Sequence, residues 1–235
     1  MRFFYDSTIS GETHILNDEE SKHCSRVLRL KVGDEIFIAD GCGNLHRSKI
    51  ELIDNKSTQV RVVEVIPEYN KLPYYLHIAI APTKNIDRIE WFLEKATEIG
   101  ISEITPVICK NSERKVVKTD RLNRIVESAM KQSYKAYHPK INEAVKFADF
   151  IKNNVSAQKF VAYCEEDGKR TYLADVVKPK TDVTVLIGPE GDFSPEEISM
   201  ALKTFVPVRL GQSRLRTETA ALVACDIVSV INQMH

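Results

Sequence analysis

The sequence predicts an α/β protein of two parts, because the spacing of its apolar residues changes near residue 70. Before this point short apolar runs alternate with polar turns, which is typical of a small β-barrel. After it, apolar runs of strand length alternate with helical patterns, which indicates a parallel sheet with helices on both faces. Two prolines, Pro67 and Pro73, flank the junction. We therefore expect one domain over residues 1–70 and a second over residues 74–235.

The first part contains three strand patterns and one helix pattern. Strands are predicted at residues 35–40, 45–53 and 57–66, with a glycine-containing turn at 41–44. A helix is expected to begin at Asn17 or Asp18, because either side chain can cap it, and to run to about Leu28. Strands of this length and spacing favour a small barrel.

The second part alternates strands and helices. Strands are predicted at residues 75–81, 104–108, 159–163, 183–187 and 207–210. Helices are predicted from Asn85 or Asp87 to Ile99, over residues 120–137, from Ser194 onward, and over residues 217–233. Gly100 supplies a stop for the first of these helices, and Ser194-Pro195-Glu196-Glu197 is a capping box.

Two glycine turns each follow a short apolar strand in the last fifth of the chain. Gly188-Pro189-Glu190-Gly191 follows one strand, and Leu210-Gly211 follows the next. Glycine lets main-chain groups approach a ligand without an intervening side chain. Open α/β sheets bind ligands at the carboxyl ends of their strands, and we expect these two ends to lie side by side. The following segment, residues 214–220, adds two arginines, a carboxylate and two hydroxyls, which indicates an enzyme site.

Composition and missing motifs exclude several classes of protein. The turn after residue 80, Ala81-Pro82-Thr83-Lys84, lacks the glycines of a Rossmann fingerprint, and no P-loop motif is present. The five cysteines are too far apart for a C-x-x-C zinc site, and their scatter fits a reducing compartment. No signal peptide and no apolar run of membrane length is found. We expect a cytoplasmic protein that binds neither a metal nor a membrane.

The charge of the chain is balanced overall but uneven locally. The formal net charge is zero, whereas residues 109–140 hold nine Lys or Arg and three Asp or Glu, an excess of +6. Such a surface suits a phosphate backbone, and the alternative is an ordinary solvated helix face. Any RNA binding must therefore come from a local patch.

Three landmarks together carry a resemblance to one family. Residues 186–191, with Leu210-Gly211 and Leu215-Arg216-Thr217-Glu218-Thr219-Ala220, resemble the RsmE family. The segments 23–29 and 95–100 match further landmarks of that family, so the resemblance spans nearly the whole chain. Its members are methyltransferases of the knotted SPOUT class, and they methylate N3 of a uridine in small-subunit (16S) ribosomal RNA.

The resemblance implies a fold, a cofactor and a partner. The expected fold is a SPOUT domain with a C-terminal trefoil knot, preceded by a small PUA-like β-barrel. The expected cofactor is S-adenosyl-L-methionine, and the expected assembly is a homodimer in which the last helix takes part. The residues expected to bind the cofactor are Leu186, Gly188, Pro189, Glu190, Gly191, Leu210, Gly211, Leu215 and Thr219.

Two residues are the catalytic candidates. Arg216 can stabilise a uracil anion, and Glu218 can orient Arg216 or accept the N3 proton; the sequence leaves these roles open. The residues expected to contact RNA are Arg26, Arg29, Arg114, Lys115, Lys118, Arg121 and Gln132. The chain departs from the family pattern at Asp192, where a second glycine is usual, and at Lys135, where arginine is usual.

Two other functions fit the same residues less well. The chain could be an RNA-binding ribosome assembly factor without activity, but such a protein has no need to keep Gly188, Gly211, Arg216 and Glu218. It could also be a SPOUT enzyme that methylates a different RNA base. Cofactor binding separates the first alternative from the enzyme, and the identity of the modified nucleoside separates the second.

Overall fold

The computed structural model describes residues 1–54, 57–164 and 170–234. The chain divides into two compact units, each with its own core. Unit 1 comprises Met1–Lys71 and Glu127–His138, and unit 2 comprises Leu72–Val126 and Pro139–His235. Unit 1 therefore takes in a segment from the middle of the sequence, which the expected domain limits do not include. No helix within the described residues is long and apolar enough to cross a membrane.

Unit 1 is built on a five-stranded sheet in the order β1-β3-β4-β5-β2. Its strands are β1 (Phe3–Tyr5), β2 (Thr13–Ile15), β3 (Glu35–Ala39), β4 (Leu45–Ile53) and β5 (Thr58–Ile66). The pair β1–β3 is parallel, and the other pairs are antiparallel. The strand predictions for β3, β4 and β5 are confirmed. The two edge strands, β1 and β2, were not predicted, because three residues are too few for a periodic pattern.

One short helix of unit 1 begins as predicted and then changes its geometry. Helix α1 (Asp18–Lys22) starts at Asn17, whose side chain accepts a hydrogen bond from the main-chain nitrogen of Glu20. A π-helical turn, η1 (His23–Val27), continues it. The predicted end at about Leu28 is therefore confirmed.

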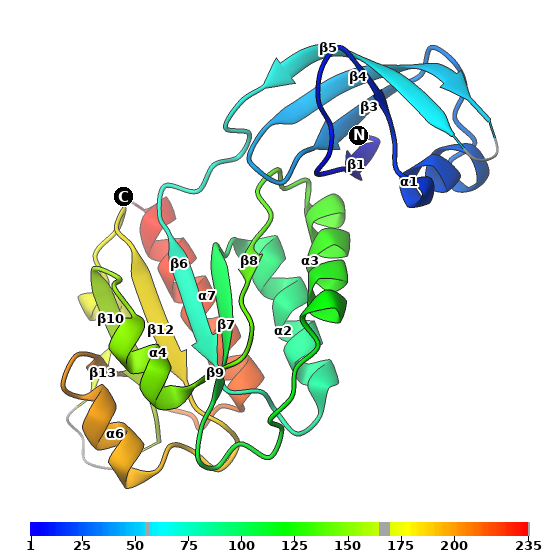
Figure 1. Ribbon diagram of the computed structural model, residues 1–235. Coiled ribbons are helices and arrows are strands. Elements are labelled where there is room, and N and C mark those ends of the chain that lie inside the picture. The colour runs from blue at the N-terminus through cyan, green and yellow to red at the C-terminus, as the bar shows by residue number, and fades with distance from the viewer. Residues whose placement is uncertain (55–56, 165–169, 235) are drawn as a thin grey trace. The chain divides into compact units, whose positions relative to one another are not determined.

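Unit 2 contains a parallel sheet (Figure 1). The strand order is β11-β13-β10-β12-β6-β7-β8, and β9 also pairs with β7. The strands are β6 (Leu76–Ile80), β7 (Glu103–Ile108), β8 (Lys140–Ile141), β9 (Val145–Lys146), β10 (Gln158–Ala162), β11 (Thr171–Tyr172), β12 (Val183–Ile187) and β13 (Val206–Arg209). All five predicted strands of this part are present.

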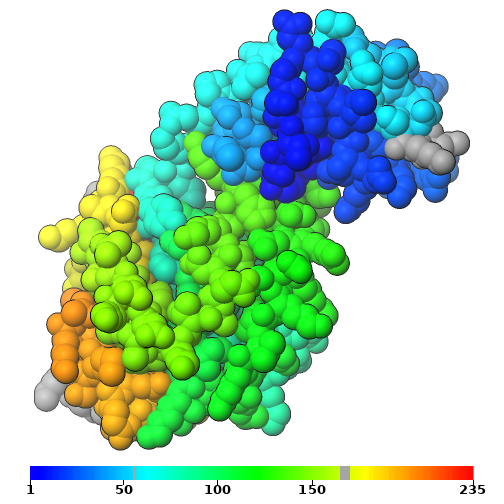
Figure 2. Space-filling view, in the orientation of Figure 1, coloured from blue at the N-terminus to red at the C-terminus, as the bar shows by residue number. Residues whose placement is uncertain are grey.

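Helices cover both faces of this sheet, as the alternating pattern predicts. Helices α4 (Phe147–Asn153) and α6 (Pro195–Ala201) lie in front of the sheet in Figure 1, while α2 (Ile86–Ile99) and α7 (Thr217–Gln233) lie behind it. Figure 2 shows the front face, where the chain around α4 and α6 forms the surface. The short helix α5 (Leu173–Val176) packs against α7.

Local signals place most helix ends of unit 2. Asn85 caps α2, and Gly100 ends it with a φ of 130°. The capping box of Ser194 and Glu197 at α6 is present in both directions. Helix α3 (Thr119–Ser133), which runs from unit 2 into unit 1, stops before the predicted residue 137. It does so because Tyr134 adopts a left-handed backbone with a φ of 55°.

One expectation about the sheet is wrong. The two strands that precede the glycine turns are β12 and β13, and β10 lies between them with parallel pairing to both. Their carboxyl ends are therefore not side by side. Strand order depends on which strands pair in three dimensions, and nothing in a single strand's sequence records its neighbours.

Candidate active site

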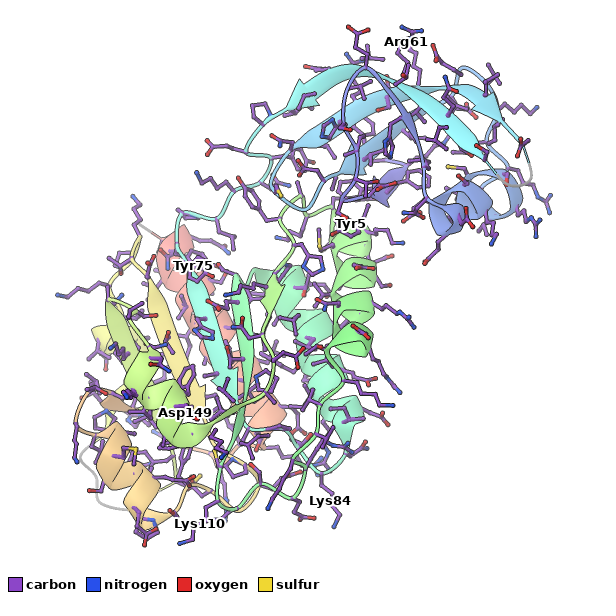
Figure 3. The ribbon with its side chains drawn as sticks, in the orientation of Figure 1. Tyr5, Arg61, Tyr75, Lys84, Lys110 and Asp149 are labelled. Carbon is purple, nitrogen blue, oxygen red and sulfur yellow. The ribbon has the colours of Figure 1, made fainter. Side chains whose placement is uncertain are left out.

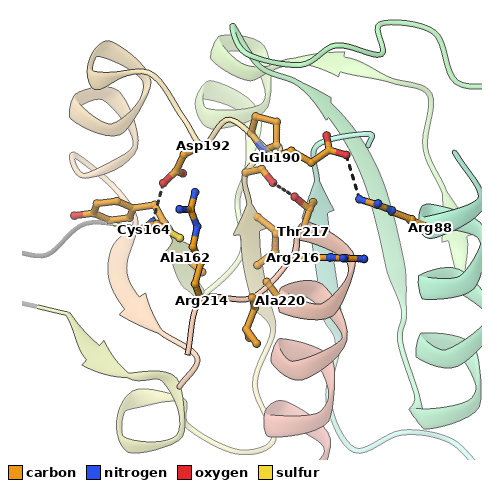
Figure 4. Close-up of a pocket in the computed structure, with 14 residues that line it drawn as sticks. Arg88, Ala162, Cys164, Glu190, Asp192, Arg214, Arg216, Thr217 and Ala220 are labelled. Carbon is orange, nitrogen blue, oxygen red and sulfur yellow. Dashed lines mark hydrogen bonds and ion pairs between the residues drawn. The ribbon is translucent and has the colours of Figure 1, made fainter. Parts of the chain in front are cut away.

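A cavity of about 410 Å³ opens at the carboxyl end of the unit 2 sheet. Three segments form most of its wall: the end of β10 with Ala162–Cys164, the turn after β12, and the segment that leads into α7. Arg88 of α2 also lines it. Figure 4 shows residues of these segments facing one space. Gly188, Pro189 and Glu190 come from the turn after β12, and the segment before α7 contributes residues 214–217.

The turn after β12 and the start of α7 are joined directly. The hydroxyl of Thr217 donates a hydrogen bond of 3.0 Å to the carbonyl oxygen of Gly188 (Figure 4). Glycine is required at 188 for packing, because a Cβ there would lie 2.9 Å from Cε2 of Phe193. That ring is itself buried and packs against Phe147. The wall of the cavity is thus part of the folded core.

Asp192 stands where the RsmE family that the sequence resembles usually has glycine, and it fits the backbone that the turn requires. Its φ is 59°, a left-handed value that Asp tolerates better than most residues. Its carboxylate accepts hydrogen bonds of 2.8 Å from the main-chain nitrogens of Cys164 and Phe193. The substitution therefore links the turn after β12 to the end of β10.

A second cavity of about 600 Å³ adjoins the first, and four residues line both: Arg88, Arg214, Leu215 and Arg216. The second cavity adds Trp91 and Asp87 from α2 and Glu218 and Thr219 from α7. Its lining residues come from the first two turns of α2, the first turn of α7 and the segment before α7, and the two helices pack against each other.

A buried carboxylate stands at this second cavity. Glu218 is 7% exposed, and its Oε2 has no hydrogen-bond partner among the residues that the structure describes. Its Oε1 lies 3.8 Å from Nε of Arg88. The same guanidinium lies 3.7 Å from Glu190, whose carboxylate also accepts from the main-chain nitrogen of Lys84 at 3.2 Å. Buried carboxylates are normally fully paired, so the free oxygen of Glu218 marks a place where a ligand donor fits.

Comparison with known proteins identifies the family. Residues 70–229 match the model of an RNA methyltransferase domain. The chain belongs to this RNA methyltransferase family. In the first part of the methyltransferase, residues 16–63 also match an RNA methyltransferase PUA domain.

Relatives and solved structures agree with this assignment. A ribosomal RNA small subunit methyltransferase E of Aquifex aeolicus is 30% identical, over 98% of this chain and 99% of the relative. A crystal structure of a probable rRNA-methyltransferase from Porphyromonas gingivalis is 41% identical, with a TM-score of 0.94, covering 100% of this chain and 99% of that one. The ribosomal RNA small subunit methyltransferase E of Neisseria gonorrhoeae, bound to S-adenosyl methionine, is 27% identical with a TM-score of 0.84, covering 96% and 95%.

The predicted fold class of the methyltransferase is confirmed: a parallel α/β domain of the SPOUT type follows a PUA-like domain. The trefoil knot stays a prediction. No group of three or more His, Cys, Asp or Glu that could hold a metal occurs within residues 1–54, 57–164 and 170–234.

The structure brings together some of the residues expected to bind the cofactor and separates others. Gly188, Pro189, Glu190 and Leu215 line the first cavity, and Thr219 lines the second, with the catalytic candidates Arg216 and Glu218. Four expected residues line neither cavity: Leu186, Gly191, Leu210 and Gly211. Leu186 belongs to the buried core of the methyltransferase, because its strand is covered on both faces. Gly211 is exposed, and nothing lies within 4 Å of the position its Cβ would take.

Several residues of the site have no counterpart in the sequence predictions, among them residues 162–164 at the end of β10 and Asp87, Arg88 and Trp91 of α2. Arg88 and Trp91 lie on the outer part of α2, about 130 residues before Glu218. Polar residues at the start of a helix usually face solvent, so their spacing gives no signal. A charged residue one turn before the chain's single tryptophan is the only local hint.

Some of the residues expected to bind RNA are already hydrogen-bonded within the protein, and others are not. Arg114 donates to the carbonyl oxygens of Thr83 and Lys84 at 3.1 and 2.8 Å, which fixes a loop of the methyltransferase. Arg121 donates to Glu90 at 2.8 Å. By contrast, Lys115 and Lys118 are exposed. Neither lysine takes part in an ion pair with any residue in the described part of the chain.

The remaining RNA candidates belong to unit 1. Arg26, Arg29 and Gln132 are all exposed there. Arg29 has a left-handed backbone with a φ of 53°. In unit 2, Figure 3 shows Lys84 and Lys110 in loops at the carboxyl end of the sheet, whereas Tyr75 lies at its amino end. Both lysines are paired, Lys84 with Glu113 and Lys110 with Glu196.

Proposed function

We propose that this chain transfers a methyl group from S-adenosyl-L-methionine to N3 of a uridine in 16S ribosomal RNA. The observation that carries the proposal is the buried carboxylate of Glu218, with one unpartnered oxygen, beside a cavity of cofactor size. The relatives named as ribosomal RNA small subunit methyltransferase E support the substrate, and the cofactor-bound structure from Neisseria gonorrhoeae supports the cofactor.

The first cavity fits the cofactor by size and by chemistry. Its volume of about 410 Å³ lies within the usual range for small-molecule sites. Gly188 exposes main-chain groups at its wall, and Leu215 and Ala220 supply apolar contacts, so recognition of the adenosine relies largely on the main chain. When bound, the sulfonium supplies a methyl group already activated for transfer, so the chain itself must only position the groups and manage one proton.

The proton to be removed is the one on uracil N3. We propose that Oε2 of Glu218 accepts it, since this oxygen is buried and unpartnered. Arg216 lines both cavities, and its proposed role is to stabilise the negative charge that develops on the uracil. Arg88 pairs with Oε1 of Glu218 and holds the carboxylate in place.

RNA contact is proposed for both parts of the chain. Residues 1–70 would grip the RNA through the exposed Arg26 and Arg29, joined by Gln132 of unit 1, and residues 74–235 would carry the chemistry. In unit 2 the exposed Lys115 and Lys118 are the preferred contacts, with Arg114 and Arg121 in supporting positions. Small subunits are assembled in the cytoplasm, and we place the protein there.

A homodimer is proposed from the surface of α7. The side of this helix that faces away from its own sheet keeps apolar residues partly exposed: Leu222, Val223, Val230 and Ile231. Val230 is 42% exposed. Partly exposed apolar residues on one side of a helix favour burial by a second copy, with the exposed Asp226 between Leu222 and Val230 as the charged exception. A twofold contact would bring the same surface together with itself.

Methyl transfer to isolated small subunits tests the function. Small subunits from cells that lack the protein would be incubated with the purified chain and cofactor carrying a labelled methyl group, and the nucleosides identified by mass spectrometry. We expect 3-methyluridine. A different methylated nucleoside would contradict the proposed base. Absence of both transfer and cofactor binding would instead support an assembly factor without activity.

A further inference from the structure

The second cavity, of about 600 Å³, lies outside the proposed cofactor site and can hold a second ligand. It adjoins the cofactor cavity through Arg88 and Arg216, and Trp91 lines it from α2. Trp91 is the only tryptophan of the chain, and it is 43% exposed. A partly exposed aromatic ring favours a flat ligand that can stack on it. A buried carboxylate oxygen without a partner favours a ligand with a hydrogen-bond donor.

We propose that this cavity is the site for the extruded uracil, with Trp91 as the stacking surface and Glu218 as the group that selects uracil. The inference rests on the function proposed above and names how the base is recognised. A base that is to be methylated must leave its stack, and enzymes hold such bases by aromatic stacking and by hydrogen bonds to the pairing edge.

The polar groups of the cavity match that edge. Uracil presents one donor, N3–H, between two carbonyl acceptors. Oε2 of Glu218 is an acceptor without a partner, and Arg88 and Arg216 supply guanidinium donors at the same cavity. Figure 4 shows Arg216 extending from the start of α7 toward the side where Arg88 lies.

The same arrangement rejects cytosine. Cytosine carries a lone pair at N3 and an amino group at C4, so it would set an acceptor against Glu218 and a donor against an arginine. Leaving a buried carboxylate without its donor is costly, and sites of this kind discriminate strongly. The methylated product also lacks the N3–H donor, so it should leave more readily than the substrate binds.

A single fluorine label on Trp91 allows binding at this cavity to be followed by fluorine NMR. Replacing tryptophan with 5-fluorotryptophan gives one fluorine resonance, because the chain has one tryptophan. The protein would be saturated with S-adenosylhomocysteine, which has no methyl group to transfer, and titrated with uridine, cytidine and 3-methyluridine 5′-monophosphates. We expect uridine monophosphate to move the resonance, and the other two to bind at least about tenfold more weakly.

Variants extend the test to the natural substrate. Trp91→Leu should lower kcat/KM for small subunits about tenfold while leaving cofactor affinity unchanged, and Trp91→Phe should stay within about threefold of wild type. Tyr75→Leu is the matched control, because Tyr75 is 39% exposed but lies at the amino end of the sheet (Figure 3). It should leave kcat/KM as it is.

Several results would overturn the inference without touching the proposed function. One is a resonance that does not move with uridine monophosphate or moves equally with cytidine monophosphate. Another is a resonance that moves only on dilution of the protein, which would assign Trp91 to contact between two copies. A third is a Trp91→Leu enzyme of normal kcat/KM. Failure of the wild-type chain to bind cofactor and to methylate small subunits would remove the proposed function itself.

Discussion

The hydroxyl of Thr217 donates a 3.0 Å hydrogen bond to the carbonyl oxygen of Gly188. This contact joins the first residue of α7 to the residue that follows β12, two positions that are 29 residues apart in the sequence. Both residues line the first cavity. The bond therefore fixes the distance between two sides of the proposed cofactor site.

We expect Thr217→Val to weaken cofactor binding about fivefold to tenfold. The substitution keeps the shape but removes the donor, at a cost of about 1 kcal/mol. Calorimetric titration with S-adenosyl-L-methionine measures the effect. Thr204→Val, an exposed threonine outside the site, is the control and should bind normally. Normal binding by the Thr217 variant would show that the two sides are held by other contacts.

Substitution of two glycines of the predicted site should affect the stability of the protein differently. Gly188→Ala would place a Cβ 2.9 Å from the ring of Phe193, so the free energy of unfolding should fall by roughly 1–3 kcal/mol. Gly211→Val has open space around its Cβ and should leave stability within about 0.5 kcal/mol of wild type. If Gly211 contacts the cofactor, the same variant should lose at least tenfold in affinity. Unchanged affinity would remove Gly211 from the site.

The stability of unit 2 should depend on pH through His77. Its pKa is lowered, mainly by burial, which disfavours the charged imidazolium. The unfolded chain therefore binds the proton first as pH falls below about 6.5, and unfolding becomes easier until the folded chain is protonated as well. Denaturant titrations between about pH 7 and pH 5 should show less loss of stability for His77→Gln than for wild type. His46, which is buried in unit 1 and also has a lowered pKa, would give the unfolding of unit 1 a pH dependence that is the same in both proteins.

RNA affinity should depend on Lys115 and Lys118 through salt. Reversing both charges should weaken binding to small-subunit RNA and reduce the slope of log affinity against log salt by about 1 to 2. Cofactor affinity should not change. Lys152→Glu with Lys203→Glu is the control, since both lysines are exposed in unit 2 outside the basic segment. An unaltered slope in the first pair would mean that this segment is only solvated.

Assembly should depend on Val230. Val230 is chosen because it is partly exposed on α7. Val228 on the same helix is 0% exposed, so a charge there would disturb folding and could not report on the dimer. Val230→Glu should convert a dimer into a monomer in sedimentation experiments at micromolar concentration. Val155→Glu, at a position that is 92% exposed, should remain dimeric. A monomeric wild-type chain would contradict the homodimer.

The sequence by itself determined the elements whose signals are local. The capping box at Ser194, the stop at Gly100 and the alternating runs of the parallel sheet are set by neighbouring residues, and each appears where it was predicted. The motif after β12 also identified the region of the cavity. Short elements such as α4 and β11 were not predicted from the sequence, because their formation depends on packing against the rest of the protein.

Only the tertiary structure decided which of these residues meet. It placed β10 between β12 and β13, so Gly211 does not line the cavity that contains Gly188. It also brought Arg88 of α2 to within 3.8 Å of Glu218. The physical reason is that strand pairing and helix packing join positions more than a hundred residues apart, and no periodicity along the chain records such contacts.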